Sequence, residues 1–401
     1  MIITQSANQQ SFGKEADPIR VMVVDDSAIV RGMITKMLET DPDFKVVATV
    51  SDGQMALSTL SRETIDVVIL DLQMPRMDGM TALPKILALS PGIKILIAST
   101  VSHKNAEISL QALRAGAADY LAKPSSNSEL SSAEYFKREL LEKARSLGQS
   151  KGRAKNSKAL SAQFQAINTA KTEETNRANH MASTPAPVMN KGQPLSIRPI
   201  PPHFYPDAIA IGSSTGGPQA LFEVISTLAT AQLNQPIFIT QHMPPTFTTI
   251  LAEQIERQCK IPCFEGKDGM LVSGGKVYLA PGDYHMIVQP ARDGHGMVIG
   301  LNKEAPENFC RPAVDPLLRS IAQSYRRGIL TVILTGMGHD GLRGAQKIVE
   351  QGGVVIAQDE ESSVVWGMPG AVATAGLCSA VLPLKEIAGQ IIRLASKRFG
   401  H

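Results

Sequence analysis

Charged and hydroxyl side chains follow several apolar segments in the first third of this sequence, at the points where those segments stop. Asp25 and Asp26 follow the run IRVMVV, and Asp71 ends the run VVILD. Ser99 ends KILIAS, and Lys123 ends DYLAK just before a proline. Short runs that are apolar throughout are typical of strands buried on both faces of a parallel sheet. Because ligands collect at the carboxyl ends of such strands, we expect these side chains to share one site.

Two or three carboxylates beside a lysine predict a site for Mg²⁺ and phosphate. Mg²⁺ is held by few protein carboxylates, keeps several waters and accepts phosphate oxygens. A simpler interpretation is that Asp25 and Asp26 only cap the helix that follows them, since Asp is a good N-cap residue. Polar groups at four strand ends together favour phosphoryl chemistry over capping alone.

A second group of reactive side chains lies in the last half of the chain. Ser214 is the centre of GSSTG, which has the G-x-S-x-G spacing of a nucleophile elbow between an apolar run and an amphipathic segment. His242 follows the apolar run PIFITQ, and Asp340 follows LTVILTGMGH. Serine, histidine and aspartate at three strand ends of one sheet predict a nucleophile, its base and the group that orients the base. Amides at the start of the helix after Ser214 would favour a developing oxyanion.

Other interpretations of this second group fit the residues less well. A glycine-rich turn between strand and helix also binds nucleotides, but this one lacks the Gly-Lys-Ser/Thr ending of a P-loop and a G-x-G-x-x-G pattern. Ser213 is off the centre of the elbow. His339 adjoins Asp340, and adjacent side chains in an extended segment point in opposite directions, so His339 is a poor partner for it. The order Ser, His, Asp differs from that of the α/β-hydrolase superfamily, so that fold is not expected.

The elements that must position these groups are predicted to form two domains, because 401 residues exceed the usual size of a single core. We predict a disordered extension at 1–18, a first domain at 19–147, a flexible linker at 148–206 and a second domain at 207–396. The linker is rich in polar residues and nearly free of aromatic ones, so it cannot bury enough apolar surface to offset the entropy of ordering. Both domains are predicted to be doubly wound parallel α/β sheets.

Composition excludes several classes of protein. The formal net charge of +3 argues neither for nucleic acid nor for an acidic membrane as a partner. The four cysteines form no CxxC pair, so neither a zinc site nor a disulfide framework is indicated. No apolar stretch has the length of a membrane span, and the amino terminus lacks the core of a signal peptide. We therefore expect a cytoplasmic protein without membrane insertion.

The first domain resembles the receiver domain of two-component response regulators over its whole length, through the strand-end residues described above. The resemblance implies the flavodoxin-like strand order. It also implies that Asp71 accepts a phosphoryl group from a histidine kinase, with Mg²⁺ bound beside it. The implied Mg²⁺ ligands are Asp25, Asp26 and Asp71, and the implied switch residues are Ser99, Tyr120 and Lys123.

The second domain resembles the catalytic domain of chemotaxis protein-glutamate methylesterases. The shared motifs are IGSSTGG, QHMPP, KVYLAPGDYHM, RPAVD, LTGMGHDG and WGMPGAV, in that order. The resemblance implies that Ser214 is the nucleophile, His242 the base and Asp340 its orienter. It also implies that the backbone amides of Thr215 and Met337 donate to the oxyanion, and that ester hydrolysis needs no cofactor.

Together the two resemblances imply a phosphorylation-activated hydrolase that acts on methyl-accepting chemoreceptors in sensory adaptation. It would remove methyl groups from γ-glutamyl methyl esters, releasing methanol, and would also deamidate receptor glutamines, because one acyl-enzyme route serves ester and amide. The alternative is a response regulator whose second domain binds a nucleotide or a protein without catalysis. Labelling of Ser214 by a serine-directed phosphonate would separate the two.

Overall fold

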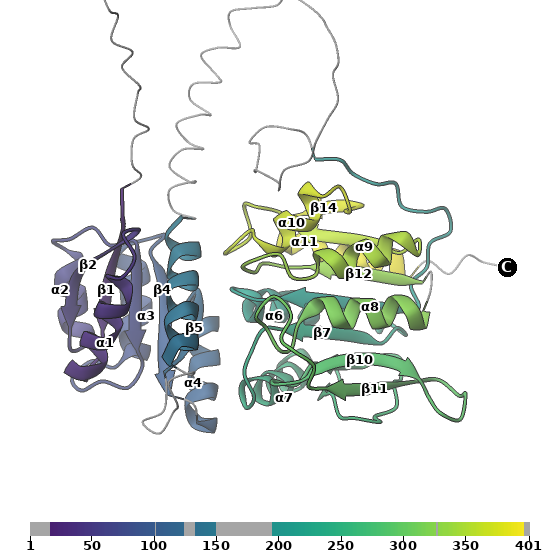
Figure 1. The fold of residues 1–401 in the computed structure, drawn as a ribbon, viewed down its shortest axis with the longest axis horizontal. Helices are drawn as coiled ribbons and strands as arrows, with labels where there is room; N and C mark the ends of the chain where they lie inside the picture. Colours follow the sequence, from purple (N-terminus) through teal and green to yellow (C-terminus); the bar gives the residue numbers. More distant parts are fainter. Residues whose placement is uncertain (1–16, 101, 124–132, 150–194, 326–327, 397–401) are drawn as a thin grey trace, which may run out of the picture.

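Two parallel sheets, each covered by helices, make up the part of the chain that the computed structural model describes (Figure 1). The described residues are 17–100, 102–123, 133–149, 195–325 and 328–396. Most of the predicted extension and most of the predicted linker lie outside these ranges. Within the ranges, no helix has both the length and the apolar character needed to cross a bilayer.

The first sheet has the strand order β2-β1-β3-β4-β5, and every neighbouring pair of strands is parallel. Its strands are β1 (Ile19–Val24), β2 (Phe44–Val50), β3 (Val67–Asp71), β4 (Lys94–Thr100) and β5 (Asp119–Lys123). The central strands are almost completely buried, as Val, Ile and Leu runs require when helices cover both faces of a sheet. This flavodoxin-like order confirms the fold predicted for the first domain.

Helices of the first domain begin at side-chain caps. Ser27, Asp52, Asp78 and Ser102 each accept a hydrogen bond from a backbone N–H of the following turn. Such caps satisfy N–H groups that a first turn otherwise leaves unpaired. The helices are α1 (Ala28–Leu38), α2 (Gly53–Leu60), α3 (Gly79–Leu89), α4 (His103–Arg114) and a helix at 133–149. Since Ser27 caps α1, the two aspartates before it are not needed for capping.

The second sheet has the strand order β14-β13-β12-β6-β7-β9-β8, again with every neighbouring pair parallel. Its strands are β6 (Ala208–Ser213), β7 (Ile237–Gln241), β8 (Cys263–Glu265), β9 (Val277–Leu279), β12 (Ile329–Ile333), β13 (Val354–Gln358) and β14 (Ala380–Leu382). The chain leaves β6 toward β7 and later returns to β12 on the other side of β6. This reversal places a topological switch point at the carboxyl ends of β6 and β12, where ligands of open α/β sheets bind.

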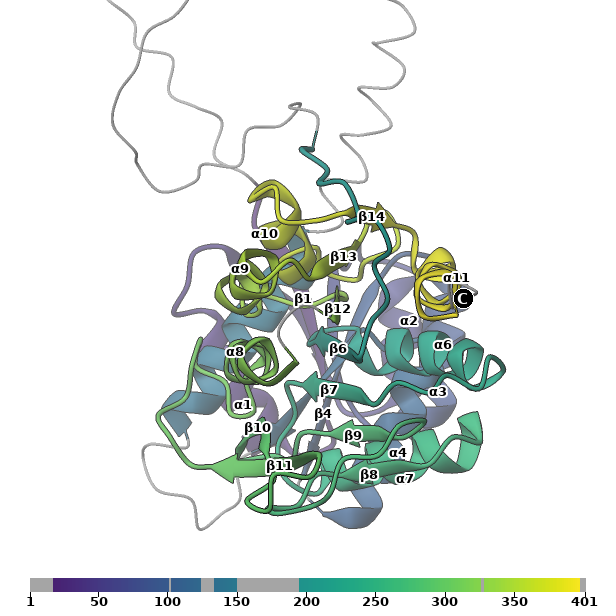
Figure 2. The ribbon, with the colours of Figure 1, turned by 90° about the vertical axis from the view of Figure 1, so that its right-hand side faces the viewer.

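Helices cover both faces of the second sheet (Figure 2). The residues of β6 alternate between the two layers, because Ile209 and Ile211 pack with α6, α7 and α11, whereas Ala208 and Ala210 pack with α8, α9 and α10. The helices are α6 (Gly217–Ala229), α7 (Phe247–Cys259), α8 (Val314–Tyr325), α9 (Leu342–Glu350), α10 (Met368–Thr374) and α11 (Leu384–Ala395). An antiparallel hairpin of β10 (His285–Pro290) and β11 (Met297–Asn302) packs against α8.

The described end of the predicted linker, residues 195–206, lies against the second domain. The Arg198 N–H donates to the carbonyl oxygen of Cys378 at 2.8 Å, and Phe204 is buried among the apolar residues of α6, α7 and α11. The packed part of this domain therefore begins before Asp207.

The two domains pack against each other through α4 of the first and α6 and α7 of the second (Figure 1). The Gln219 side chain donates from Nε2 to the carbonyl oxygens of Leu113 at 2.8 Å and Ala117 at 2.5 Å. The rings of Tyr120 and Phe247 stack with their centroids 4.4 Å apart. The carboxyl ends of β6 and β7 therefore face the first domain.

Candidate active site and phosphoryl-acceptor site

Two adjacent serines at the turn between β6 and α6 have different environments. Ser213 is fully buried, and its hydroxyl donates to Gln241 Oε1 at 2.7 Å. Ser214 is the next residue, and its carbonyl oxygen accepts from Gln241 Nε2 at 2.9 Å. Gly216 has a φ of 76°, and a Cβ on Gly217 would lie 2.0 Å from Gln241 Oε1. The turn thus needs both glycines. Gln241 accepts a hydrogen bond from the Ser213 hydroxyl, whereas it contacts Ser214 only at the backbone carbonyl oxygen.

His242 and Asp340 form a hydrogen-bonded pair next to this turn. Ser213 pairs in register with Gln241 across β6 and β7, so Ser214 and His242 follow neighbouring strand ends. His242 Nε2 lies 2.7 Å from Asp340 Oδ2, and the Asp340 side chain is only 1% exposed. The structure therefore brings the predicted serine, histidine and aspartate to one edge of the sheet.

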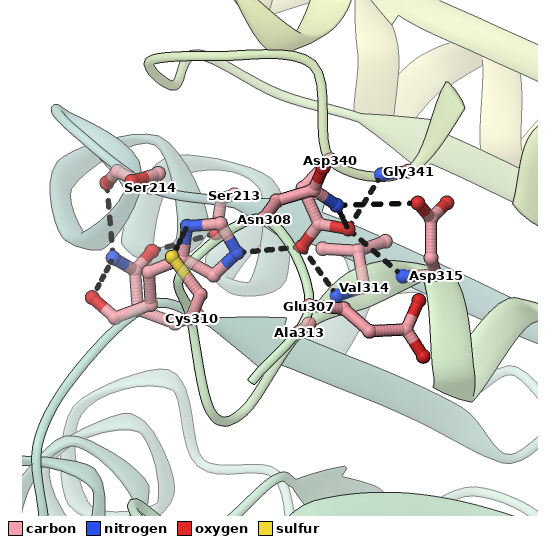
Figure 3. Close-up of polar contacts among 12 residues, drawn as sticks. Ser213, Ser214, Glu307, Asn308, Cys310, Ala313, Val314, Asp315, Asp340 and Gly341 are labelled. Atoms are coloured by element: carbon pink, nitrogen blue, oxygen red, sulfur yellow. Dashed lines mark hydrogen bonds and ion pairs between the residues drawn. The ribbon is translucent and has the colours of Figure 1, made fainter. Parts of the chain in front are cut away.

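Asp340 accepts several further hydrogen bonds, which Figure 3 shows around its carboxylate. The donors are the backbone N–H groups of Val314, Asp315 and Gly341 and the side-chain amide of Asn308. Burial alone would raise the pKa of Asp340, but hydrogen bonds from His242 and from these amides lower it below its usual value. Asp340 is thus held as a carboxylate in an orientation fixed by four donors besides the histidine.

The second ring nitrogen of His242 contacts a cysteine. His242 Nδ1 lies 3.4 Å from Cys310 Sγ, and among the described residues no hydrogen bond joins this ring to Ser214. Burial lowers the pKa of His242, but Cys310 and Asp340 together outweigh that effect and raise the pKa to about 10. In this arrangement the imidazole is biased toward its protonated form.

The residues predicted to bind an oxyanion lie on either side of Ser214. The side-chain hydroxyl of Thr215 donates to Asp119 Oδ2 of the first domain at 2.6 Å. A Cβ on Gly336 would approach the Ser214 amide nitrogen to 3.1 Å, so the segment that carries Met337 passes directly beside Ser214. Met337 itself packs against an apolar cluster of the first domain. This placement fits the predicted backbone donors, whose role stays a prediction.

The acidic residues of the first domain converge as predicted. One oxygen from each of Asp25, Asp26 and Asp71 lies within 4.8 Å of the others. Lys123 Nζ lies 2.6 Å from Asp25 and 3.1 Å from Asp71. Burial raises the pKa of Asp71, and the charge of Asp25 raises it further against the opposing effect of Lys123. A divalent cation would relieve this repulsion, and Asp26 is exposed, so the site fits a partly hydrated Mg²⁺.

Two of the three predicted switch residues, Ser99 and Tyr120, lie on the neighbouring strands β4 and β5. Ser99 and Ala122 pair in register across β4 and β5, and the Ser99 side chain is buried. Tyr120 is 2% exposed because its ring stacks on Phe247 of the second domain. Lys143 also covers the Tyr120 ring, with Nζ 4.8 Å from its centroid, and donates to the Tyr120 carbonyl oxygen at 2.6 Å.

Comparison with known proteins agrees with both halves of this description. Residues 209–391 match the CheB methylesterase family, and residues 21–134 match the response regulator receiver domain. The protein-glutamate methylesterase/protein-glutamine glutaminase of group 2 operon from Rhodospirillum centenum is 57% identical over 96% of this chain and 95% of its own length. The chain belongs to the CheB methylesterase family. A relative from Rhodospirillum rubrum, protein-glutamate methylesterase/protein-glutamine glutaminase 1, is 51% identical over 99% of this chain and all of its own.

A solved structure of a CheB methylesterase matches the second domain alone. The crystal structure of the Thermotoga maritima CheB methylesterase catalytic domain shares 42% identity over 47% of this chain and 98% of its own, with a TM-score of 0.45.

In this member of the CheB methylesterase family, several residues around the predicted Ser214, His242 and Asp340 group were not predicted from the sequence. Gln241, Asn308 and Cys310 contact the triad or its turn, and Asp119 reaches Thr215 from the other domain. Gln241 directly precedes His242 at a strand end, and this position in the sequence could have identified it as a neighbour of the site. Asn308 and Cys310 lie in an irregular loop without periodicity, so their position could not be derived from the pattern.

Two other histidines of this family member lie outside the triad. His339 is exposed, in agreement with its rejection as a partner of Asp340. His285 is completely buried, and its ring accepts from the Ala313 N–H at 3.2 Å and lies 3.1 Å from the Ala305 carbonyl oxygen. These bonds explain His285 as a structural residue that holds the start of α8.

Proposed function

We propose that this chain is a phosphorylation-activated protein-glutamate methylesterase and protein-glutamine glutaminase. The observation that carries the proposal is the buried His242–Asp340 pair beside Ser214, at the switch point of the second sheet. The names of its relatives give protein-glutamate methyl esters and protein glutamines as substrates. In this chain the substrate proteins would be methyl-accepting chemoreceptors. The activity would adjust receptor methylation in chemotactic adaptation.

In the proposed acylation step, Ser214 Oγ attacks the γ-carbonyl carbon of the glutamyl methyl ester. Asp340 accepts a hydrogen bond from the Nε2–H of His242, which leaves Nδ1 as the ring nitrogen that takes the serine proton. The tetrahedral oxyanion is received by the amides of Thr215 and Met337. His242 then returns the proton to the leaving methoxide, so that methanol departs and an acyl-Ser214 ester remains.

In the proposed deacylation step, His242 takes a proton from water, which attacks the acyl-Ser214 carbonyl. Collapse of the second tetrahedral species protonates Ser214 Oγ and releases the glutamate side chain. A glutamine substrate follows the same route with ammonia as the first leaving group. The sheet edge supplies the same nucleophile and base for both substrates.

Control would come from Asp71 in the receiver domain. A histidine kinase phosphoprotein or a small phosphodonor would transfer its phosphoryl group to Asp71, with Mg²⁺ held by Asp25, Asp26 and Asp71. Mg²⁺ supplies charge neutralisation for the incoming phosphoryl oxygens. Lys123 is close enough to Asp71 to pair with the acyl phosphate, and Ser99 and Tyr120 would pass the change to the domain interface.

Methanol release from methylated receptor membranes tests the catalytic proposal. We expect methanol from the full chain and a further increase with acetyl phosphate and Mg²⁺. A serine-directed phosphonate should block release and label Ser214, with Ser213 as the internal control. Absence of both methanol release and labelling would favour the alternative, in which the second domain only binds a ligand.

A further inference from the structure

Both ring nitrogens of His242 are engaged in the resting chain. Nε2 bonds to Asp340 at 2.7 Å, and Nδ1 lies 3.4 Å from Cys310 Sγ, within reach of a sulfur hydrogen bond. A proton from Ser214 can therefore move to Nδ1 only after the sulfur has left that nitrogen. Cys310 therefore occupies the ring nitrogen that Ser214 must reach.

We propose that Cys310 is a positioning residue that occupies the base nitrogen of His242 in the resting chain, and that receiver helix 133–149 keeps it there through Phe309. The proposal rests on the function proposed above, in which His242 is the general base. In this proposal the receiver restrains the active site in two ways: it covers Ser214, and it holds Cys310 against the base.

The loop that carries Cys310 is in direct contact with the receiver helix. The guanidinium carbon of Arg138 lies 4.4 Å from the centroid of the Phe309 ring, a cation–π arrangement. Tyr135, one turn earlier on the helix, has its pKa raised to about 12, mainly by burial and by Glu139, with a further contribution from the nearby Cys310 sulfur. Arg138 thus links helix 133–149 to the loop, and its guanidinium carbon also lies 5.2 Å from the centroid of the Tyr135 ring on the same helix.

The loop backbone is held in an unfavourable conformation. Asn308 and Phe309 have φ values of 51° and 63°, a left-handed region that residues with side chains seldom adopt. Asn308 is fixed from the inner side, because its amide donates to Asp340 Oδ1 at 3.0 Å and to Asp315 Oδ2 at 3.3 Å. A conformation of this kind persists only where surrounding contacts hold it. Removal of the receiver contact at Phe309 would allow the loop to relax and Cys310 to withdraw.

Alkylation of Cys310 tests the contact without any measurement of ester hydrolysis. Iodoacetamide reacts with an accessible thiol, and the contact at 3.4 Å holds the Cys310 sulfur against the His242 ring. We expect Cys310 to be alkylated several-fold faster in full-length His242→Gln, where the ring no longer holds the sulfur, than in the unchanged chain. The other three cysteines are buried and serve as internal references in the peptide analysis. Equal rates for Cys310 in the two proteins would overturn the proposed contact.

The basal methanol-release rate of the full chain tests the competition. Cys310→Ala should raise the basal kcat several-fold with little change in KM, because the base nitrogen becomes free while the substrate site is untouched. Cys310→Ser retains a polar partner for Nδ1, so its basal rate should fall between those of the unchanged chain and Cys310→Ala. Cys378→Ala removes a thiol far from the triad and is the matched control. A basal rate that falls in Cys310→Ala would show that the thiol supports the base and would overturn the proposal.

A double substitution tests the part played by the receiver helix. Arg138→Ala should raise the basal rate, and Arg138→Lys should restore restraint because lysine keeps the positive charge over Phe309. If both residues act on one contact, Arg138→Ala with Cys310→Ala should be no faster than Cys310→Ala alone. If the two substitutions multiplied each other's effect on the basal rate, Arg138 and Cys310 would act independently, and the proposed link to the receiver would be overturned. A chain without esterase activity in any variant would contradict the proposed function and leave the alkylation result to decide the contact.

Discussion

Ser213 and Ser214 are adjacent in the chain but differ in what their hydroxyl groups can do. Ser213 is fully buried and its hydroxyl donates a hydrogen bond to Gln241 Oε1, so it stabilises the turn. Ser214 is the residue next to His242 in the strand register. Ser213 is the last residue of β6 and Ser214 begins the turn, so the two side chains leave the backbone in different directions.

Replacement of Ser214 by alanine should leave the fold intact and reduce methanol release by several powers of ten. Loss of a triad member typically leaves a residual of about 10³–10⁴ over water, because the oxyanion donors remain. Ser213→Ala removes one hydrogen bond and should retain most of the activity. Initial rates and thermal melts of the two variants provide the measurement, and a dead Ser213→Ala beside an active Ser214→Ala would exchange their roles.

The rate of the resting chain should rise with pH through the titration of His242. Its pKa is raised to about 10, so the imidazolium predominates at neutral pH and cannot accept the serine proton. Deprotonation restores the base, and the rate increases as the pH approaches that value. Initial rates between about pH 6 and pH 10 should show this limb, and His242→Gln should abolish it with most of the rate.

Asp315 provides the control for that pH profile. Its pKa is raised to about 6 by burial and by the charge of Asp340, so it titrates well below His242. Asp315→Asn should therefore leave the limb at higher pH in place. If the limb disappeared in Asp315→Asn, the titration would belong to Asp315 and not to His242.

At the scale of elements, the connection between β6 and α6 decides whether the catalytic edge forms. Its close packing depends on glycine, since a Cβ on Gly217 would meet Gln241 Oε1 at 2.0 Å and Ser213 Cβ at 2.9 Å. Gln241 lies at the end of β7 and bonds to both serines of the turn. The Gln241 side chain therefore couples the register of β7 to the turn and to the position of Ser214.

Gly217→Ala should destabilise the second domain and impair catalysis together. Forcing a methyl group into this packed turn typically costs about 1–3 kcal/mol and shifts the backbone that carries Ser214. Gly389→Ala is the control, because Gly389 lies on α11 with open space around it, and a helix gains about 1 kcal/mol from this exchange. Chemical denaturation and methanol release of both variants are the measurements, and unchanged activity in Gly217→Ala would contradict this account of the turn.

At the scale of the whole molecule, the receiver lies against the edge of the sheet that carries Ser214. The Thr215 hydroxyl donates to Asp119, and Lys143 lies 3.4 Å from the same aspartate. Asp119 thus connects Thr215, the residue after Ser214, with the strand that carries Tyr120 and Lys123. Phosphorylation adds a charge of roughly −1.5 to −2 at Asp71, two strands away in the same sheet.

A fragment that begins at residue 195 should be more active than the unphosphorylated full chain, because nothing then covers Ser214. Starting at 195 keeps Phe204 and the Arg198 hydrogen bond in place. A change of about 1.4 kcal/mol in docking free energy alters the undocked fraction up to tenfold. Initial rates of the fragment and the full chain provide the measurement, and a slower fragment would leave the receiver with a purely activating role.

Asp71→Asn in the full chain should remove activation by acetyl phosphate and preserve the basal rate. The amide cannot accept a phosphoryl group, whereas the contacts around Asp119 are unchanged. Rates with and without phosphodonor and Mg²⁺ test this expectation. Activation that survives in Asp71→Asn would place the phosphoryl acceptor elsewhere.

Local pattern was sufficient for the two parallel sheets, the family and the residues at the strand ends. Apolar runs that stop at polar residues identify strand ends, and in a parallel sheet those ends share one edge whatever the strand order. For that reason Asp25, Asp71, Ser214, His242 and Asp340 could be proposed without coordinates.

The amino-acid sequence by itself determined two parallel α/β domains and the two groups of reactive residues, because strand pattern and spacing are local properties of the chain. The flavodoxin-like order of the first domain came from its resemblance to receiver domains. Only the tertiary structure decided which partners complete those groups. Asn308 and Cys310 reach the triad from an irregular loop, and Asp119 reaches Thr215 across 96 positions of sequence. Such contacts depend on how loops and domains pack, and no periodicity of the sequence encodes that packing.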